Sequence, residues 1–357
     1  MPEQRIPITD LDLILKETAS LWGEMRDQRI FITGGTGFFG CWLLESFAHI
    51  NRELHLNALA TILTRDPAAF AKKCPHLAAD PSLTFLPGDI RAFVFPEDDF
   101  KYVIHAATEA SAKQAAEEPL EMLTTILNGT ERTLKFAAAH GTQKFLLTSS
   151  GAVYGKQPPT LTHIPEDYLG GPNPLDPAAV YAEGKRASEQ MCALYARQTA
   201  IEFKIARCFA FVGPHLPLDA HFAIGNFIRD TMRGSPIAIS GDGTPTRSYL
   251  YAADLAIWLW TMLFRAPPMQ AFNVGSEEAI SIADLARTVV ATLYPGIPIN
   301  IAKQPSSGNP LQQYVPSTQN AQRHLNLRPT VNLLEAIRRT AAWHKFTVSN
   351  EHPAKSA

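Results

Sequence analysis

Residues 29–40, RIFITGGTGFFG, decide the fold of this 357-residue chain. A run of β-branched and aromatic residues ends in three glycines, Gly34, Gly37 and Gly40, which predicts a strand, a tight turn and the start of a helix. Glycines let the backbone come close to a phosphate, and the start of the helix offers unpaired N–H groups and a positive dipole end. The stretch therefore predicts a site for the pyrophosphate of a dinucleotide. An ordinary glycine-rich turn is the alternative that this stretch leaves open by itself.

Segments typical of strands and helices alternate after this stretch. Strands are expected at residues 58–64, 83–89, 102–108, 144–150, 201–211 and 271–275. Helices are expected at residues 41–50, 120–140, 179–199, 255–264, 281–293 and 333–343. Such alternation predicts an α/β fold, a Rossmann-type doubly wound parallel sheet with a smaller C-terminal α+β substrate-binding part.

The predicted boundaries follow from this pattern. Residues 1–207 would form the dinucleotide-binding domain, with its sheet completed by about 244–276. Residues 208–243 and 277–348 would form the smaller part, and the polar residues 349–357 would be a disordered tail. Before the first strand, Ile8, Leu11 and Leu15 have the spacing of an amphipathic helix, with Thr9 or Asp10 as a candidate N-cap.

Composition excludes several classes of partner. The net charge of -2 gives no basic patch for nucleic acid or for an anionic membrane. The four cysteines form no CxxC pair, which favours a reducing compartment and predicts no zinc site. No apolar run approaches the roughly 18 residues of a membrane span, and the N-terminus lacks the basic residues of a signal peptide. We expect a soluble, cytoplasmic protein.

Four expected strands end in residues suited to a ligand. Gly34, Asp89, Ala107 and Ser150 all stand at or just after the carboxyl end of a predicted strand. In open parallel sheets ligands bind at those ends, so the four segments should meet in one crevice. This convergence favours the dinucleotide site over the ordinary turn.

Tyr181 and Lys185 are candidates for proton transfer. They are four residues apart in a predicted helix and therefore project from the same face. An ammonium group beside a phenol lowers the tyrosine pKa toward the range of a general acid or base. Ser150 could hold the substrate oxygen that gains or loses the proton. A chance pair on the helix surface is the alternative.

The segments TGGTGFFG, GDI, HAAT, SSGAVYG, YAEGK and ARCFAFVGP, in this order and spacing, resemble the extended short-chain dehydrogenase/reductase family that acts on nucleotide sugars. The resemblance covers about residues 28–345. It implies an enzyme in which Ser150, Tyr181 and Lys185 are catalytic, and a homodimer formed through the helices at 120–140 and 179–199.

The same resemblance implies a set of binding residues, with Asp89 beside the adenine and Ala106 and Ala107 along the cofactor phosphate and ribose. Together with the residues of the glycine-rich stretch and of the second strand's end, the predicted cofactor-binding residues are Gly34, Gly37, Phe38, Phe39, Gly40, Thr64, Arg65, Asp89, Ile90, Ala106, Ala107, Tyr181 and Lys185. The implied substrate-binding residues are Thr108, Ser150, Asn226 and Arg247, the last two on the nucleotide diphosphate. A guanidinium suits a phosphate. A solvated loop charge for Arg247 and a helix cap for Asn226 are the alternatives.

Gly151 and Ala152 bear on the reaction. At these positions the dehydratases of the family carry Asp-Glu and its uronic-acid decarboxylases carry Ser-Glu, so dehydration is disfavoured and the decarboxylase pattern is broken. The segments NFIRDTMRG and TRSY nevertheless resemble the decarboxylase branch. Hydride transfer at a sugar carbon remains, either as net reduction of a 4-keto sugar or as redox-neutral 4-epimerisation.

The end of the second predicted strand bears on the cofactor. An acidic residue there binds the ribose of NAD, whereas this chain has Thr64-Arg65-Asp66, and Arg65 suits the 2′-phosphate of NADP(H). If Asp66 reaches the ribose instead, the cofactor is NAD(H). The leading hypothesis is an NADPH-dependent reductase of a nucleotide-linked 4-keto-6-deoxyhexose that feeds surface polysaccharide. The alternatives are a 4-epimerase or UDP-glucuronate decarboxylase-like enzyme that retains NAD, and a non-catalytic dinucleotide-binding protein.

The chain also departs from the family pattern elsewhere. Ala210 stands where members often have an asparagine that contacts the substrate. His215 and His221 are candidates for replacing that contact, with a surface histidine of no role as the alternative for each. Residues 312–321, QQYVPSTQNA, stand where members commonly carry an arginine or aspartate, so no site residue is assigned there.

Overall fold

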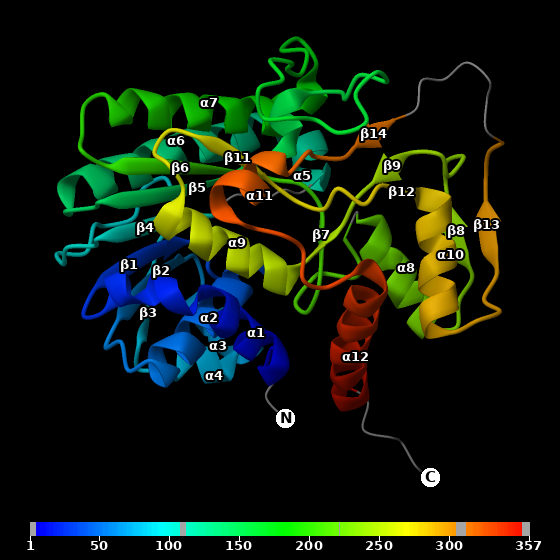
Figure 1. Cartoon of the computed structure of the whole chain (residues 1–357), viewed down its shortest axis with the longest axis horizontal. Helices are drawn as coiled ribbons and strands as arrows, with labels where there is room; N and C mark the ends of the chain where they lie inside the picture. Colours follow the sequence, from blue (N-terminus) through cyan, green and yellow to red (C-terminus); the bar gives the residue numbers. More distant parts are fainter. Residues whose placement is uncertain (1–4, 108–111, 221, 305–311, 352–357) are drawn as a thin grey trace.

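The computed structural model describes residues 5–107, 112–220, 222–304 and 312–351. Its centre is a parallel sheet of seven strands in the order β11-β6-β5-β4-β1-β2-β3 (Figure 1). The strands are β1 Arg29–Thr33, β2 Leu59–Thr64, β3 Leu83–Pro87, β4 Tyr102–His105, β5 Lys144–Ser150, β6 Glu202–Cys208 and β11 Ala271–Val274. The strand order reverses between β1 and β4, which is where an open α/β sheet forms its ligand crevice. The predicted Rossmann-type fold is confirmed.

Helices cover both faces of this sheet. One face carries α1 Ile8–Thr18, α2 Phe38–Glu53 and α9 Ala252–Arg265, and the other carries α6 Pro119–Ala139 and α7 Val180–Ala196 (Figure 1). Side chains alternate along each strand, so Ile30 and Ile32 of β1 enter the core beneath α2 and α9. Phe31 points the other way, into a phenylalanine-rich core with Phe136 of α6.

The smaller part is built from short strand pairs that the sequence does not predict. β7 Phe211–Val212 pairs with β10 Leu250–Tyr251, β8 Ile237–Ile239 pairs with β13 Ile299–Ile301, and β9 Thr246–Arg247 lies between β12 Ile280–Ser281 and β14 Gln313–Tyr314. Its helices are α8 Ala223–Met232, α10 Ile282–Leu293, α11 Gln319–Leu325 and α12 Leu333–Glu351. The remaining elements are η1 Ala19–Met25, α3 Pro67–Lys73, α4 Pro75–Ala78, α5 Ala112–Glu117, η2 Gly151–Tyr154 and η3 Pro177–Ala179.

The prediction of an N-cap at Thr9 or Asp10 is wrong. Neither Thr9 nor Asp10 caps α1, because the helix begins after Pro7 and the Asp10 carboxylate is buried, where it accepts a hydrogen bond from the Tyr251 hydroxyl at 2.6 Å. The C-terminal helix α12 ends at Glu351 and overlaps the first residues of the predicted disordered tail at 349–357, whose disorder stays a prediction. Residues 352–357 lie outside the described part of the chain.

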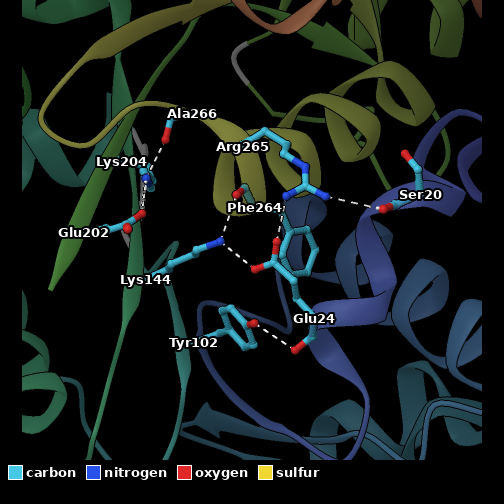
Figure 2. Close-up of polar contacts among 9 residues, drawn as sticks. All are labelled: Ser20, Glu24, Tyr102, Lys144, Glu202, Lys204, Phe264, Arg265 and Ala266. Carbon is cyan, nitrogen blue, oxygen red and sulfur yellow. Dashed lines mark hydrogen bonds and ion pairs between the residues drawn. The ribbon is translucent and has the colours of Figure 1, made fainter.

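A polar network fastens the amino ends of the central strands (Figure 2). Glu24 of η1 pairs with Lys144 of β5 at 2.6 Å and with Arg265 of α9 at 2.7 Å. Lys144 and Lys204 also donate to the carbonyls of Phe264 and Ala266 at the end of α9, where cations complement the helix dipole. This network lies at the amino ends of the strands, away from the carboxyl ends where a ligand crevice forms. Among the described helices, none has the length and apolar character needed to cross a membrane.

Candidate active site

Two glycines of the turn between β1 and α2, Gly34 and Gly40, have no room for a side chain. Gly34 has φ +73°, and a Cβ there would lie 2.5 Å from the carbonyl carbon of Ala106. A Cβ on Gly40 would lie 2.2 Å from the carbonyl carbon of Gly35. Gly37 is the N-cap of α2, so the first N–H groups of this helix are available to an anion. This backbone cradle fits the pyrophosphate of a dinucleotide.

The end of β4 closes against the same turn. Ala106 N donates to Thr33 O at 3.2 Å, and Ala107 N donates to the Thr33 hydroxyl at 3.1 Å. Phe38 and Phe39 open α2, and Phe39 packs edge-on against Phe211 at 5.0 Å. The structure therefore brings these predicted cofactor residues together at the carboxyl ends of β1 and β4. Their contacts with a cofactor stay predictions.

The ends of β2 and β3 carry charged groups that already have partners. Asp66 caps α3 by accepting the Ala69 N–H at 2.8 Å, while Thr64 is buried and Arg65 is exposed. Asp89 forms two hydrogen bonds of 2.8 Å with the Arg91 guanidinium. The hydrogen bond from Arg91 lowers the pKa of Asp89, and the nearby positive charge of Arg65 acts in the same direction.

Ile90, the remaining predicted cofactor residue, packs against α6. A Cβ on Gly129 of that helix would lie 2.9 Å from Ile90 Cγ1. Ile90 therefore fixes how closely α6 approaches the end of β3. Its contact with the cofactor stays a prediction.

Ser150, Tyr181 and Lys185 come together at the carboxyl end of β5. Ser150 is the last residue of this strand, and its hydroxyl is hydrogen-bonded to the Tyr181 hydroxyl and accepts the Ala152 N–H at 3.1 Å. Lys185 is 2% exposed and donates to the Thr148 carbonyl at 2.7 Å. The spacing of Tyr181 and Lys185 in α7 places both side chains on the face that packs against β5.

The acid–base properties of this group differ from the prediction. Burial raises the pKa of Tyr181 to about 12, against the opposing effect of the hydrogen bond with Ser150. Burial also lowers the pKa of Lys185 to about 8, against the opposing effects of Cys208 and Glu189. The predicted lowering of the tyrosine pKa is therefore wrong for this structure, because burial disfavours the phenolate and Lys185 donates to the Thr148 carbonyl.

A second tyrosine, Tyr314 of β14, reaches the same serine. Its hydroxyl is also hydrogen-bonded to Ser150, and burial raises its pKa. Its ring lies 4.6 Å from the Phe209 ring, and the Arg247 guanidinium lies 5.8 Å from its centroid. Tyr314 is not predictable from the sequence, because a strand of two residues within 312–321 leaves no periodic pattern.

Position 151 is closed to larger side chains. A Cβ on Gly151 would lie 2.6 Å from the Phe209 ring. Ala152 follows in η2, and its backbone N–H is engaged by Ser150. Glycine and alanine stand next to Ser150, and a larger residue at position 151 would require the Phe209 ring to move.

Of the predicted substrate-binding residues, Arg247 lies near Ser150, whereas Asn226 is hydrogen-bonded within its own helix. Arg247 of β9 lies beside Tyr314 and is thereby connected to Ser150, whereas Asn226 of α8 accepts a hydrogen bond from Arg229 at 3.0 Å. His215 is not a surface residue, because it is 7% exposed and packs against Trp343 at 4.6 Å. Thr108 and His221 lie outside the described residues.

Comparison with known proteins decides the family. The model of the NAD dependent epimerase/dehydratase family matches residues 30–275, which is more than half of the chain. The chain belongs to this family. UDP-glucuronic acid decarboxylase 1 of Arabidopsis thaliana is 30% identical over 327 residues, covering 92% of this chain and 72% of that protein. The enzyme assignment is thereby confirmed.

Solved structures agree with the fold. UDP-glucose 4-epimerase of Thermotoga maritima, in complex with UDP-glucose, aligns with a TM-score of 0.73 at 21% identity, covering 90% of this chain and all of that one. UDP-glucose 4-epimerase of Thermus thermophilus, in complex with NAD, aligns with a TM-score of 0.72 at 23% identity, covering 89% and 99%. At these identities the likeness shows the fold alone.

The comparisons also bear on the expected reaction and cofactor. The family is NAD dependent, and the predicted preference for NADP(H) finds no support in it. The decarboxylase named above and the family description favour the redox-neutral alternatives over the leading hypothesis of a 4-ketoreductase. The homodimer and the cytoplasmic location stay predictions.

Proposed function

We propose that this chain is an NAD-retaining enzyme that epimerises C4 of a UDP-linked sugar without net oxidation or reduction. The observation that carries the proposal is the hydroxyl cluster of Ser150 and Tyr181 above buried Lys185, next to Gly151 and Ala152. Hydride transfer at a sugar carbon needs the proton-transfer group formed by Ser150, Tyr181 and Lys185. Water elimination would need a further acid and base, and positions 151 and 152 supply neither.

The cradle formed by Gly34, Gly37 and Gly40 would hold the cofactor pyrophosphate. NAD supplies the hydride acceptor and, in its reduced form, the hydride donor when it is bound. Arg247, beside Tyr314, is the cation placed to bind the diphosphate of the sugar nucleotide. Ser150 orients the oxygen on C4 by a hydrogen bond.

Tyr181 moves the proton. As the phenolate it would accept the proton of the 4-hydroxyl while C4 is oxidised, and as the phenol it would return the proton when C4 is reduced from the other face. A pKa of about 12 keeps this phenol protonated at neutral pH in the ligand-free structure. Lys185, four residues along α7, is the cation that would lower this pKa in the loaded enzyme.

Decarboxylation of a UDP-linked uronic acid is the second candidate. The specific observation in its favour is the 30% identity to a protein named UDP-glucuronic acid decarboxylase over 92% of this chain. Oxidation at C4 of such a substrate makes a β-keto acid, which can lose carbon dioxide. Tyr181, with Ser150 and Lys185 beside it, would then return the proton to the shortened sugar, and the hydride would come from the reduced dinucleotide.

The test begins with the cofactor. The purified chain is denatured, and the released dinucleotide is identified by mass, with NAD(H) expected. The protein is then incubated without added cofactor with UDP-glucose, with UDP-N-acetylglucosamine and with UDP-glucuronic acid labelled with 13C at C6, and the products are followed by NMR. A C4 epimer supports the proposal, and labelled carbon dioxide supports the second candidate. A requirement for added NADPH, consumed in proportion to product, overturns both.

Tyr181→Phe tests the proposed proton transfer. It should retain the cofactor and lower kcat by about 10²- to 10⁴-fold, because the ring stays and only the acid–base group is lost. Tyr195→Phe, on the same helix α7, is the matched control and should keep full turnover. Turnover of Tyr181→Phe at the wild-type rate would exclude Tyr181 from the chemistry.

A further inference from the structure

Three buried residues with soft donor atoms meet next to the glycine-rich turn. One donor atom each of Cys41, Cys74 and His215 lies within 4.8 Å of the other two. Cys41 follows Gly40 in the first turn of α2, Cys74 links α3 to α4, and His215 lies between β7 and α8. Three segments far apart in the sequence therefore converge on one point.

The histidine of this cluster has a buried ring nitrogen that could bind a ligand. His215 Nε2 has no hydrogen-bond partner among the described residues, although its side chain is 2% exposed. A buried polar atom without a partner is costly, and native structures rarely retain one. Cys41 and Cys74 hydrogen-bond each other, so neither thiol fills the place in front of His215 Nε2.

The donor set suits zinc. Two thiolates and a neutral imidazole are ligands that Zn²⁺ prefers, with bonds of about 2.3 Å to sulfur and about 2.0 to 2.1 Å to nitrogen. A tetrahedral ion of this kind holds its donor atoms about 3.5 to 3.8 Å apart. Donor atoms already within 4.8 Å of one another need to shift by only about 1 Å or less to reach this geometry.

Neighbouring charges complete the site. Glu45 Oε1 lies 4.0 Å from His215 Nε2 and is hydrogen-bonded to His76 Nε2 at 2.7 Å. A carboxylate held by a histidine is the arrangement that orients a metal ligand, so Glu45 is placed to be the fourth ligand. Lys73 Nζ lies 3.9 Å from Cys41 Sγ, at the side of the cluster that faces the glycine-rich turn.

We propose that Cys41, Cys74 and His215 bind one Zn²⁺ ion, with Glu45 as the fourth ligand. The ion would fasten the glycine-rich turn, because Cys41 adjoins Gly40 and Lys73 donates to the Thr36 carbonyl of the turn at 3.2 Å. The proposal reverses the expectation of no zinc that the cysteine spacing gave. That expectation relied on paired cysteines close in sequence, whereas these ligands come from three separate segments.

The experiment measures the metal in the full chain purified under reducing conditions without chelators. About one zinc per chain is expected, and Cys41→Ser, Cys74→Ser and His215→Gln should each lose it. Cys192→Ser is the matched control, since Cys192 is buried in α7 among the phenylalanine-rich core residues, and it should keep the zinc. A chelator should lower the unfolding midpoint of the wild type and leave the midpoints of the three ligand variants unchanged.

A second measurement uses the wild-type chain alone, so its outcome does not depend on whether the variants fold. The reduced chain, freed of metal and titrated with Co²⁺, should develop a sulfur-to-cobalt charge-transfer band and the visible bands of tetrahedral cobalt, and Zn²⁺ should displace them. Failure of the folded, reduced chain to bind either ion overturns the proposal. A Cys41–Cys74 disulfide without metal in the chain as purified, detected by peptide mass, overturns it as well.

Discussion

Tyr314 shows what one residue adds to the proposed reaction. A serine hydroxyl has one proton to donate, yet Ser150 is hydrogen-bonded to both Tyr181 and Tyr314. The Ser150 hydroxyl can donate its proton to one phenol and accept a hydrogen bond from the other. A second tyrosine at this place can hold Ser150 in the orientation that receives the sugar oxygen, and can itself contact the sugar.

Tyr314→Phe should lower kcat/KM by roughly tenfold, the cost of one hydrogen bond, while the chain keeps its dinucleotide. The measurement is steady-state kinetics on the substrate that the product screen identifies, with Tyr195→Phe as the control for loss of a tyrosine hydroxyl elsewhere. Unchanged kcat and KM would show that the Tyr314 ring only fills space against Phe209.

His105 should make stability depend on pH. Its ring is buried at the end of β4, with Nδ1 2.8 Å from the Thr33 hydroxyl and Nε2 3.2 Å from the Thr130 hydroxyl. Burial lowers the pKa of His105 to about 3, with the charge of Lys185 acting in the same direction. A lowered pKa means that the unfolded chain binds the proton more tightly, so stability is full above the unfolded pKa of about 6.5 and is lost as pH falls toward 3.

Between pH 7 and pH 5 this group should remove about 2 kcal/mol from the free energy of unfolding. His105→Gln keeps hydrogen-bonding capacity without the titration, so its loss over the same interval should be smaller by that amount. Urea unfolding at both pH values measures the difference. His55→Asn, at an exposed histidine with φ +48°, should show the wild-type pH dependence. Equal slopes for wild type and His105→Gln would contradict the assignment.

At the scale of elements, the close contact of turn, strand and helix should be intolerant of a single methyl group. Gly40→Ala places a Cβ 2.2 Å from the Gly35 backbone, so α2 must move away from the turn. We expect the purified variant to lose its bound dinucleotide and to unfold at a lower temperature. Gly23→Ala in η1 is the matched control, because no described atom lies within 4 Å of the added Cβ. Retention of dinucleotide by Gly40→Ala would refute the proposed cradle.

The elements themselves explain what could be predicted from the sequence. Residues 29–40 predict β1, the turn and α2 because glycine spacing is a local property, and β5 at Lys144–Ser150 was expected at the same bounds. Ser150, Tyr181 and Lys185 were found because a strand end and a helical four-residue spacing are both readable. Tyr314 was missed because its place depends on the pairing of β14 with β9, a contact between two-residue strands.

Features that depend on burial could not be predicted from the sequence either. The phenol pKa of Tyr181 was expected to fall and is raised instead, since the sequence gives no measure of desolvation at the carboxyl end of β5. The Cys41, Cys74 and His215 cluster was overlooked for a related reason. Its donor atoms come from α2, the α3–α4 link and the loop after β7, and only the packing of these segments brings them together.

For the whole molecule, the N-terminal helix α1 links the central sheet to the smaller part. Asp10 of α1 accepts hydrogen bonds from the Tyr251 hydroxyl of β10 at 2.6 Å and from the Arg339 guanidinium of α12 at 2.5 Å. Burial raises the pKa of Asp10, while Tyr251 and Arg339 oppose that shift. One buried carboxylate thus holds three elements that begin far apart in the chain.

Asp10→Asn should lower the free energy of unfolding by about 1 to 3 kcal/mol, because the amide keeps the shape but loses the charge-assisted bond to Arg339. The Glu335 carboxylate, 2.8 Å from Arg339 Nε, remains as a partner and limits the loss. Urea unfolding measures it, with Glu17→Gln on the surface of α1 as the control. A double-mutant cycle with Arg339→Met should give a coupling energy of the same sign. Because neither residue reaches Ser150 through a described contact, kcat should stay at the wild-type value. A loss of turnover without loss of stability would mean that Asp10 affects the active site and does not stabilise the contact of α1 with β10 and α12.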